Sequence, residues 1–374
     1  MEELTDTPVL LLDRDRLDGN ILRMREKLAP FNVTLRPHVK TNKCLEVTER
    51  FFADGRGPIT VSTLREADFF FAAGFTDILY AVGISPNKFA HAARLLEQGA
   101  DLKLVLDNLE SARLLAEFAC SSGQAFEVLL EVDCDGHRSG IAPQSTLLVE
   151  IAHLLNNSGV RVSGVMTHAG NSYDSRSIAE IEAYARQERA AVVEAAQLLN
   201  EAGFDLSIIS IGSTPTALFT QDLSGITEVR AGVFAFFDLV MAGLGVCDVQ
   251  DIAVSVLTTV IGHQPEKGWT IVDAGWMALS RDRGTAKQRV DQGYGIVCDL
   301  SGQPIGDLIV TAVNQEHGII SSRSGNPEAV LVLPVGTQLR ILPNHACATA
   351  AQHSGYHVLT EGRHLGYWPR FAGW

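Results

Sequence analysis

The sequence lacks the features that define several other classes of protein. Its six cysteines include no CxxC pair and no compact framework, which excludes a disulfide-stapled secreted domain. No stretch of about 18 apolar residues occurs, and the N-terminal run MEELTDTPVLLLDRD has no basic segment followed by a long apolar one. We therefore expect a cytoplasmic protein that does not bind or cross a membrane.

Positive charge is also scarce. The 30 Lys and Arg against 44 Asp and Glu leave a formal net charge of -14, which would repel polyphosphate. There is no basic patch interleaved with aromatic residues, so we do not expect a nucleic acid as partner. No GxGxxG follows an early strand, and this weighs against a dinucleotide-binding doubly wound sheet, the rival fold for the first part of the chain.

Short β-branched runs alternate with longer helical patterns through roughly the first two thirds of the chain. This alternation is typical of repeated βα units around a parallel sheet. The strands are predicted near residues 33–39, 58–62, 77–82, 102–106, 126–132, 161–167, 207–211 and 229–236. Eight is the number that closes a β/α (TIM-type) barrel.

After Asp238 the strands follow one another without long helices, as in AVSVLTTVIGH, WTIVDAGW, LIVTAVN, TQLRILPN and YHVLT. This change predicts a second, mostly β domain. We place the barrel at residues 14–244 and the β domain at 245–374, the latter joined by a strand at 7–13.

The run LRPHVKTNKC places basic side chains on what reads as a buried strand. Successive side chains of a strand point to opposite faces, so Arg36, His38 and Lys40 share one face and the apolar residues between them share the other. Buried cations are costly, whereas an amine that forms an imine or loses its proton avoids part of that cost. Lys40, at the carboxyl end of the first strand, is therefore a candidate Schiff-base lysine, with a solvated surface cation as the plain alternative.

A candidate phosphate site lies at the same end of the predicted barrel. The run IGSTPT, residues 211–216, follows the seventh strand, and Gly232 follows Arg230 in the eighth. Phosphates usually bind in these two loops of a barrel, although a plain turn and helix cap has the same composition. Together with Lys40, the loops favour a phosphate-bearing aldehyde, pyridoxal phosphate.

Several runs carry a family resemblance. PHVKT around Lys40, THAGNSY at 167–173, GSTPT at 212–216 and PNHAC at 343–347 resemble the D-serine dehydratase and D-threonine aldolase family, in that family's order along nearly the whole chain. The family belongs with alanine racemase to the fold-type III pyridoxal phosphate enzymes. VDAGWMALSRDRGTA at 272–286 and NQEHGI at 314–319 resemble its D-threo-3-hydroxyaspartate dehydratases most closely.

The resemblance implies roles for individual residues. It makes Lys40 the lysine that carries the cofactor and the base at the substrate Cα. The phosphate group would be held by Gly212, Ser213, Thr214 and the backbone of Gly232 and Val233. Tyr173 would contribute to cofactor binding.

Three further cofactor contacts follow from the resemblance. His168 resembles a histidine that packs on the ring, and Arg138 resembles an arginine near the phenolic oxygen. A structural histidine and a surface arginine are equal alternatives. Arg230 takes the place of the arginine that faces the ring nitrogen in the racemases, although other members of this family lack it.

A second candidate site lies near the C-terminus. His345 and Cys347 are two residues apart, so on an extended chain both point the same way and offer a metal ion a borderline-soft pair of ligands. A packed cysteine beside a polar histidine is the plain alternative. Two protein ligands would leave coordination positions open for catalysis, and the resemblance supports zinc or another divalent ion such as manganese or magnesium. Glu316 and His317 could lie in a second shell.

The function expected is a dehydratase of 3-hydroxy D-amino acids, D-threo-3-hydroxyaspartate or D-serine, that releases a keto acid and ammonia. An aldolase is the alternative within the family, but similar aldolases carry HxD at the metal and a more glycine-rich phosphate loop. A non-catalytic pyridoxal phosphate carrier is a second alternative. Arg281 and Arg283 could meet a distal carboxylate or lie on the surface. Family relatives are dimers, which implies a homodimer here.

Overall fold

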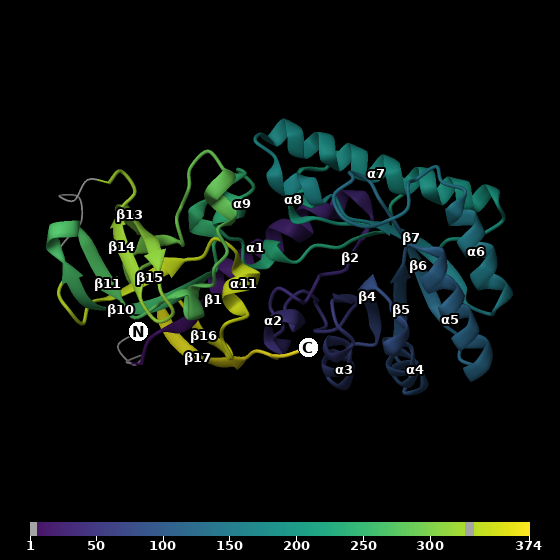
Figure 1. Ribbon diagram of the computed structural model, residues 1–374, viewed down its shortest axis with the longest axis horizontal. Helices are drawn as coiled ribbons and strands as arrows, with labels where there is room; N and C mark the ends of the chain where they lie inside the picture. The colour runs from purple at the N-terminus through teal and green to yellow at the C-terminus, as the bar shows by residue number, and fades with distance from the viewer. Residues whose placement is uncertain (1–5, 326–332) are drawn as a thin grey trace. The chain divides into compact units, whose positions relative to one another are not determined.

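A computed structural model describes residues 6–325 and 333–374 of the chain (Figure 1). The chain divides into two compact units. The barrel unit comprises Met24–Gly232 with Gly373–Trp374, and the β unit comprises Met1–Arg23 with Val233–Ala372. The β unit is therefore built from two segments that are far apart in the sequence. The domain boundaries inferred above, 14–244 and 245–374, stay a prediction.

The barrel unit is built on eight parallel strands in the order β2-β9-β8-β7-β6-β5-β4-β3. They are β2 (Thr34–Leu35), β3 (Ile59–Val61), β4 (Asp77–Gly83), β5 (Asp101–Leu106), β6 (Glu127–Val132), β7 (Arg161–Thr167), β8 (Ile208–Ile211) and β9 (Glu228–Val229). Residues after β2 complete the ring, because the amide of Thr60 donates to the carbonyl of Pro37 at 2.9 Å and the amide of Val39 donates to the carbonyl of Thr60 at 3.0 Å. The predicted β/α barrel is confirmed.

Helices cover the outside of this sheet (Figure 1). They are α2 (Leu45–Glu49), α3 (Leu64–Ala72), α4 (Phe89–Glu97), α5 (Leu109–Ser122), α6 (Leu147–Asn157), α7 (Ile178–Glu201) and α8 (Thr214–Phe219), preceded by α1 (Arg14–Leu28). The side chains of Thr63, Asn108, Ser177 and Ser213 accept a hydrogen bond from the first turn of α3, α5, α7 and α8, which fixes where these helices begin. Within the barrel, side chains from four successive strands form one buried cluster, Leu79, Val105, Leu129 and Met166.

The β unit contains nine strands in the order β11-β14-β13-β12-β15-β10-β1-β16-β17. They are β1 (Val9–Asp13), β10 (Val254–Gln264), β11 (Trp269–Val272), β12 (Ile296–Cys298), β13 (Pro304–Val313), β14 (Gly318–Ser322), β15 (Gln338–Leu342), β16 (Gly355–Thr360) and β17 (Arg363–Pro369). An additional pairing of β10 with β11 closes the antiparallel strands β10 to β15 into a second barrel. Short helices α9 (Leu239–Gly243), α10 (Trp276–Leu279) and α11 (Ala346–Ala350) interrupt the strands. The predicted mostly β domain is confirmed.

Two predicted strands are shorter than expected. The eighth was expected to reach residue 236, but β9 ends at Val229 and a 3-10 helix, Val233–Ala235, follows. The first was expected over 33–39, but regular pairing covers only Thr34–Leu35. In both, the chain must leave the sheet to form the loops at the carboxyl end of the barrel. Every helix in the described residues is too short or too polar to cross a bilayer.

Candidate active site

Five of the candidate residues follow neighbouring strands of the barrel. Arg138 comes after β6, His168 directly after β7, Gly212 directly after β8, Arg230 directly after β9 and Lys40 after the extension of β2. The strand order β6-β7-β8-β9-β2 makes these strands consecutive. Because parallel strands present their carboxyl ends at one rim of a barrel, the five residues gather on the same side.

The three basic side chains of the first strand have different surroundings. Arg36 is 3% exposed, and its guanidinium donates to Glu228 at 2.7 Å and to Asp77 at 2.8 Å. His38 is half-buried, and Lys40 is exposed because the chain turns after Val39. The expectation of three buried cations was therefore wrong: the buried one is neutralised by two carboxylates, and the strand ends before Lys40.

His38 lies among the basic groups of the rim. Burial lowers its pKa well below the usual value, and the charges of Lys40, Arg230 and His168 lower it further. These three residues are therefore within electrostatic range of one imidazole. Nδ1 of His38 is buried and makes no hydrogen bond to any described residue. A buried polar atom of this kind suits a site that takes up a polar ligand.

His168 is held in one orientation and one protonation state. Its Nδ1 donates to the carbonyl of Gly212 at 2.5 Å, and its ring lies 6.0 Å from that of Tyr173 between centroids. Burial lowers the pKa of His168 to about 3; the hydrogen bond to Gly212 opposes this, and the charges of Arg138, Arg230 and Lys40 add to it. The imidazole is therefore neutral at ordinary pH, and it can pack on an aromatic ring without adding charge.

The loop after β8 presents hydroxyl and amide groups. Ser213 caps α8, with its Oγ accepting from the amide of Thr216 at 3.2 Å. The amide of Thr214 donates to the hydroxyl of Tyr173 at 3.4 Å. The amide of Gly212 donates to the carboxyl of Glu188 at 3.0 Å. Ser213 is 2% exposed and Thr214 is 0% exposed, so both lie inside the loop. The amide of Thr214 links the loop to Tyr173, as the amide of Gly212 links it to Glu188.

Glycine is required on both candidate phosphate loops by close backbone approach. A Cβ atom added at Gly212 would lie 1.7 Å from the carbonyl oxygen of Arg230. One added at Gly232 would lie 2.7 Å from Oγ1 of Thr41 and 2.8 Å from the carbonyl oxygen of His38. The loop after β8 therefore packs directly against Arg230 after β9, and the loop after β9 packs against the turn that carries Lys40. Val233 begins the following 3-10 helix and is assigned to the β unit.

The two candidate arginines differ in their freedom to meet a ligand. Arg230 is buried, donates from Nε to Oγ of Ser210 at 2.8 Å and donates from Nη2 to the carbonyl of Thr167. Burial lowers its pKa, and the charge of Glu228 opposes this. The Arg138 side chain is 58% exposed and lies 3.7 Å from the carboxylate of Glu131. Arg230 thus already supports the barrel interior, while Arg138 can still turn toward a ligand.

The candidate metal ligands lie at the start of α11. His345 is the N-cap of this helix and Cys347 lies in its first turn, so the expectation of an extended chain was wrong. Nδ1 of His345 pairs with Oδ2 of Asp282 at 2.7 Å. Burial would lower the pKa of His345, but hydrogen bonds to Asp282 and Cys347 and the charge of Asp238 raise it to about 11. The helical turn therefore brings the histidine and the cysteine together.

The donor set fits a divalent ion bound by few protein atoms. An imidazole and a thiolate are borderline-soft ligands, and a ligating histidine usually donates its other ring N–H to a carboxylate, as Nδ1 of His345 does to Asp282. In the part of the chain that the structure describes, no three His, Cys, Asp or Glu side chains converge to enclose an ion. The arrangement therefore suits an open site rather than a closed structural one.

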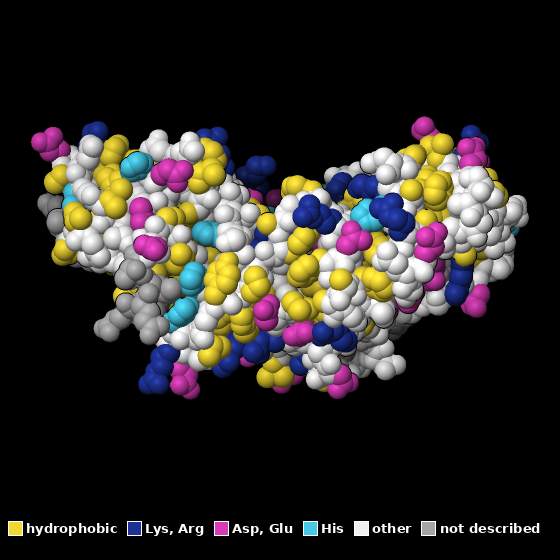
Figure 2. Space-filling view, turned by 90° about the horizontal axis from the view of Figure 1, so that it is seen from below, with side chains coloured by type: hydrophobic (Ala, Val, Ile, Leu, Met, Phe, Trp, Pro, Cys, Tyr) yellow, Lys and Arg dark blue, Asp and Glu magenta, His cyan; other side chains and the backbone are white. Residues whose placement is uncertain are grey.

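The other candidate residues of the β unit are exposed. Arg281 stacks on Trp276 at 4.5 Å from the ring centroid, and Arg283 pairs with Asp291 at 2.6 Å. Glu316 and His317 are exposed beside the turn between β13 and β14. On the face shown in Figure 2, acidic and basic side chains are mixed.

Sequence reasoning missed Glu188, which is fully buried beneath the loop after β8. It shares the inner face of α7 with Ile181, Ala185 and Val192, so a carboxylate on an otherwise apolar helical face was the available signal. It also missed Asp282, for which the sequence around it offered no pattern.

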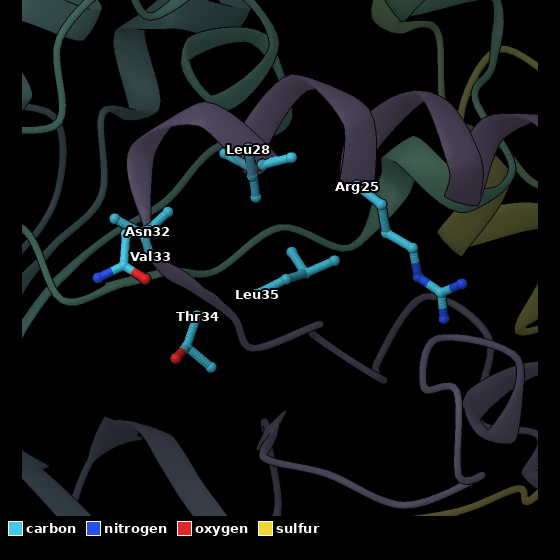
Figure 3. Close-up of a pocket in the computed structure, with 7 residues that line it drawn as sticks. Arg25, Leu28, Asn32, Val33, Thr34 and Leu35 are labelled. Carbon is cyan, nitrogen blue, oxygen red and sulfur yellow. The ribbon is translucent and has the colours of Figure 1, made fainter.

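A pocket of about 350 Å³ lies at the other end of the first strand. It is lined by Arg25, Leu28, Ala29, Asn32, Val33, Thr34 and Leu35. Figure 3 shows Leu28 and Leu35 on facing sides, from α1 and β2. The start of β2 lines this pocket, whereas Lys40 lies beyond the end of β2. The pocket is therefore separate from the candidate active site.

Comparison with known proteins agrees with this arrangement. Residues 12–240 match the family model described as alanine racemase, N-terminal domain, and residues 253–359 match the putative serine dehydratase domain. The fold and site thus define a fold-type III pyridoxal phosphate enzyme of the alanine racemase type.

The relatives identify the family within that class. The chain is 51% identical to a D-threo-3-hydroxyaspartate dehydratase of Delftia sp. (strain HT23), over 99% of this chain and 98% of that protein. It is 32% identical to a D-serine dehydratase of Dictyostelium discoideum, over 96% and 95% of the two chains. A D-threonine aldolase of Arthrobacter sp is 28% identical, over 96% and 90%. The solved Delftia dehydratase superposes with a TM-score of 0.97 at 50% identity, covering 99% of both chains.

The chain belongs to the D-serine dehydratase and D-threonine aldolase family. Members found here are named as dehydratases and aldolases, that is, lyases, and the protein is a lyase. The predictions of the family and the enzyme class are confirmed.

Proposed function

We propose that the protein is a dehydratase that uses pyridoxal phosphate and a divalent metal ion to convert D-threo-3-hydroxyaspartate or D-serine into a keto acid and ammonia. The observation that carries the proposal is the 51% identity to the Delftia dehydratase over almost the full length of both proteins. The aldolases are more distant, and the Cys347 position and the GSTPT loop also favour dehydration.

Pyridoxal phosphate, when bound, supplies an aldehyde for attachment to the protein and a ring that accepts electrons from the substrate Cα. Nζ of Lys40 is the attachment point and the group that removes the α-proton. Neutral His168 would pack on the ring, and Ser213, Thr214 and Tyr173, with the backbone at Gly232 and Val233, would hold the phosphate. Gly212 allows its loop to approach the carbonyl oxygen of Arg230 closely.

Arg138, which is exposed on the same rim, supplies positive charge near the phenolic oxygen. Arg230 would face the ring nitrogen, with its remaining N–H groups as the available donors.

A divalent ion, when bound, supplies a Lewis acid for departure of the substrate 3-hydroxyl, which is a poor leaving group in water. His345 and Cys347 would hold it, with Asp282 fixing the imidazole. Two solved variants of a D-threo-3-hydroxyaspartate dehydratase, each 50% identical to this chain, support this choice. They replace a histidine and, two residues further on, a cysteine by alanine, and the cysteine variant is described as metal-free. Zinc is the expected ion, with manganese or magnesium as substitutes. A homodimer in the cytoplasm completes the proposal.

A substrate panel tests it. The purified protein is incubated with D-threo-3-hydroxyaspartate, D-serine and D-threonine, before and after chelation and after addition of zinc or manganese. We expect ammonia and a keto acid from the first two substrates, lost on chelation and restored by metal. Glycine and acetaldehyde from D-threonine without ammonia would instead establish the aldolase, and cofactor binding with no turnover would establish a carrier.

A further inference from the structure

The carboxyl group of Glu188 joins the two loops that carry the candidate cofactor contacts. Glu188 is 0% exposed, and its Oε1 accepts from the amide of Ala169 at 3.1 Å and from the amide of Gly212 at 3.0 Å. Its Oε2 lies 2.6 Å from Oγ1 of Thr216. Ala169 follows His168 at the end of β7, and Gly212 follows β8. One side chain from α7 therefore fixes the ends of both strands.

A chain of buried hydroxyl groups leads away from this carboxyl. Oγ1 of Thr216 lies 2.8 Å from Oγ of Ser213, which lies 2.9 Å from Oγ of Ser172. The Ser172 hydroxyl donates to the carbonyl of Ala169 at 2.7 Å. With the contact to Glu188, this makes four oxygen–oxygen contacts, and the three hydroxyls supply three protons.

Counting these protons distinguishes the two forms of the carboxyl. If Glu188 is ionised, Thr216 must donate to it, and Ser172 already donates to Ala169. Ser213 then has one proton for two neighbouring oxygens, so one contact of 2.8 or 2.9 Å has no proton between its atoms. Such a contact between buried oxygens is repulsive.

We propose that Glu188 is a neutral carboxylic acid that carries its proton on Oε2 and sets the direction of the hydroxyl chain. Glu188 then donates to Thr216, Thr216 to Ser213, Ser213 to Ser172 and Ser172 to the carbonyl of Ala169, so that every contact contains one proton. Oε1, as the carbonyl oxygen, accepts both backbone amides with its two lone pairs. Oγ of Ser213 still accepts from the amide of Thr216 at 3.2 Å.

The surroundings of Glu188 agree with this assignment. Burial is the largest effect and raises its pKa, whereas the contact with Thr216, the amides of Ala169 and Gly212 and the charge of Arg230 lower it. Arg230, at the end of β9, faces it, and its own guanidinium is also directed to Ser210 and Thr167. The pKa of the Cys134 thiol, after β6, is also affected by Glu188.

Glu188 is thus a positioning residue for the rim. It holds the turn after His168 and the loop from Gly212 to Thr216 in fixed register. If the proposed function is correct, the neutral form also avoids placing a buried negative charge beneath the phosphate group. This second consequence rests on the proposed function; the protonation state does not.

Infrared spectroscopy of the purified protein without added cofactor tests the protonation state. At neutral pH we expect a carbonyl stretching band of a protonated carboxylic acid in the wild type and its loss in Glu188→Gln. A wild-type minus variant difference that contains carboxylate bands alone would overturn the proposal. Because the band is assigned by its loss in Glu188→Gln, this result is independent of which reaction the enzyme catalyses.

The same variant has a second, functional readout. The glutamine amide reproduces the acceptor and the donor of a neutral acid, so Glu188→Gln should fold and bind pyridoxal phosphate with a Kd within about twofold of wild type. Glu188→Ala leaves two buried amides without an acceptor and should weaken cofactor binding by about 10-fold or more. If Glu188→Gln fails to fold, or binds inorganic phosphate severalfold more tightly at neutral pH, the native residue is an anion and the proposal is wrong.

Discussion

Arg36 offers a direct test of how the barrel is held together. Its Nε donates to Glu228 on β9 at 2.7 Å, and Nη1 and Nη2 donate to Asp77 on β4 at 2.8 and 3.2 Å. Replacement by methionine keeps most of the apolar volume and removes the cation. Asp77 is partly exposed and retains Lys103 at 2.8 Å, so its loss is small. Glu228, with a side chain 6% exposed, keeps the Ser210 hydroxyl at 2.8 Å and the nearby charge of Arg230, but loses its direct ion pair.

Removing one partner of a buried ion pair costs about 3–5 kcal/mol because the other charge stays buried. Since Lys103 still neutralises Asp77, we expect Arg36→Met to lower the free energy of unfolding by about 3 kcal/mol, at the lower end of that range. Urea unfolding followed by circular dichroism measures it. The matched control is Arg36→Met with Glu228→Gln, which removes both charges and should recover more than half of the loss. A decrease in the free energy of unfolding below about 1 kcal/mol, which is typical of exposed ion pairs, would refute the reasoning. A double variant that is no more stable than Arg36→Met would also refute it.

Three further predictions concern the candidate sites. Gly212→Ala should lower the free energy of unfolding by about 1–3 kcal/mol and weaken cofactor binding, because the new Cβ would lie 1.7 Å from the carbonyl oxygen of Arg230. Urea unfolding measures the first effect. Unchanged stability and affinity would contradict the close approach. Because burial lowers the pKa of His168 to about 3, its contribution to stability is fully present above its unfolded pKa of about 6.5 and declines as the pH falls toward 3. Nitrogen-15 NMR should therefore show no protonation of this ring between pH 5 and 8, and a midpoint in that range would be contrary evidence. Cys347→Ala should lose bound divalent metal in elemental analysis while keeping the cofactor absorbance; full metal occupancy would place the ion elsewhere.

The sequence predicts the fold well because local patterns determine it. Several barrel strands are short and almost fully buried, and a helix with a recognisable cap follows β3, β5, β7 and β8. The ends of the strands were less predictable. β9 ends at Val229 because the chain then packs Gly232 against the turn after β2, a contact between segments almost 200 residues apart. No local pattern contains that information.

In the candidate site too, residues that follow local patterns were predictable, and residues that depend on distant contacts were not. Lys40, His168 and Gly212 were predictable because each follows a predicted strand directly or within a short turn. Glu188 was not, because the groups it contacts lie on two loops, 19 to 28 residues away along the chain. The geometry at His345 was predicted incorrectly, since the run PNHAC gives no sign that a helix begins there, although the two side chains still meet.

The identity of the lysine that holds the cofactor is the central claim, and borohydride reduction followed by peptide mass spectrometry tests it most directly. We predict a pyridoxyl adduct on Lys40 and none on Lys43, which is buried and paired with Glu66 at 3.0 Å. In Lys40→Ala the adduct and the cofactor absorbance should both disappear. An adduct on Lys43 or any other lysine of the wild type, or no adduct at all, would contradict the account.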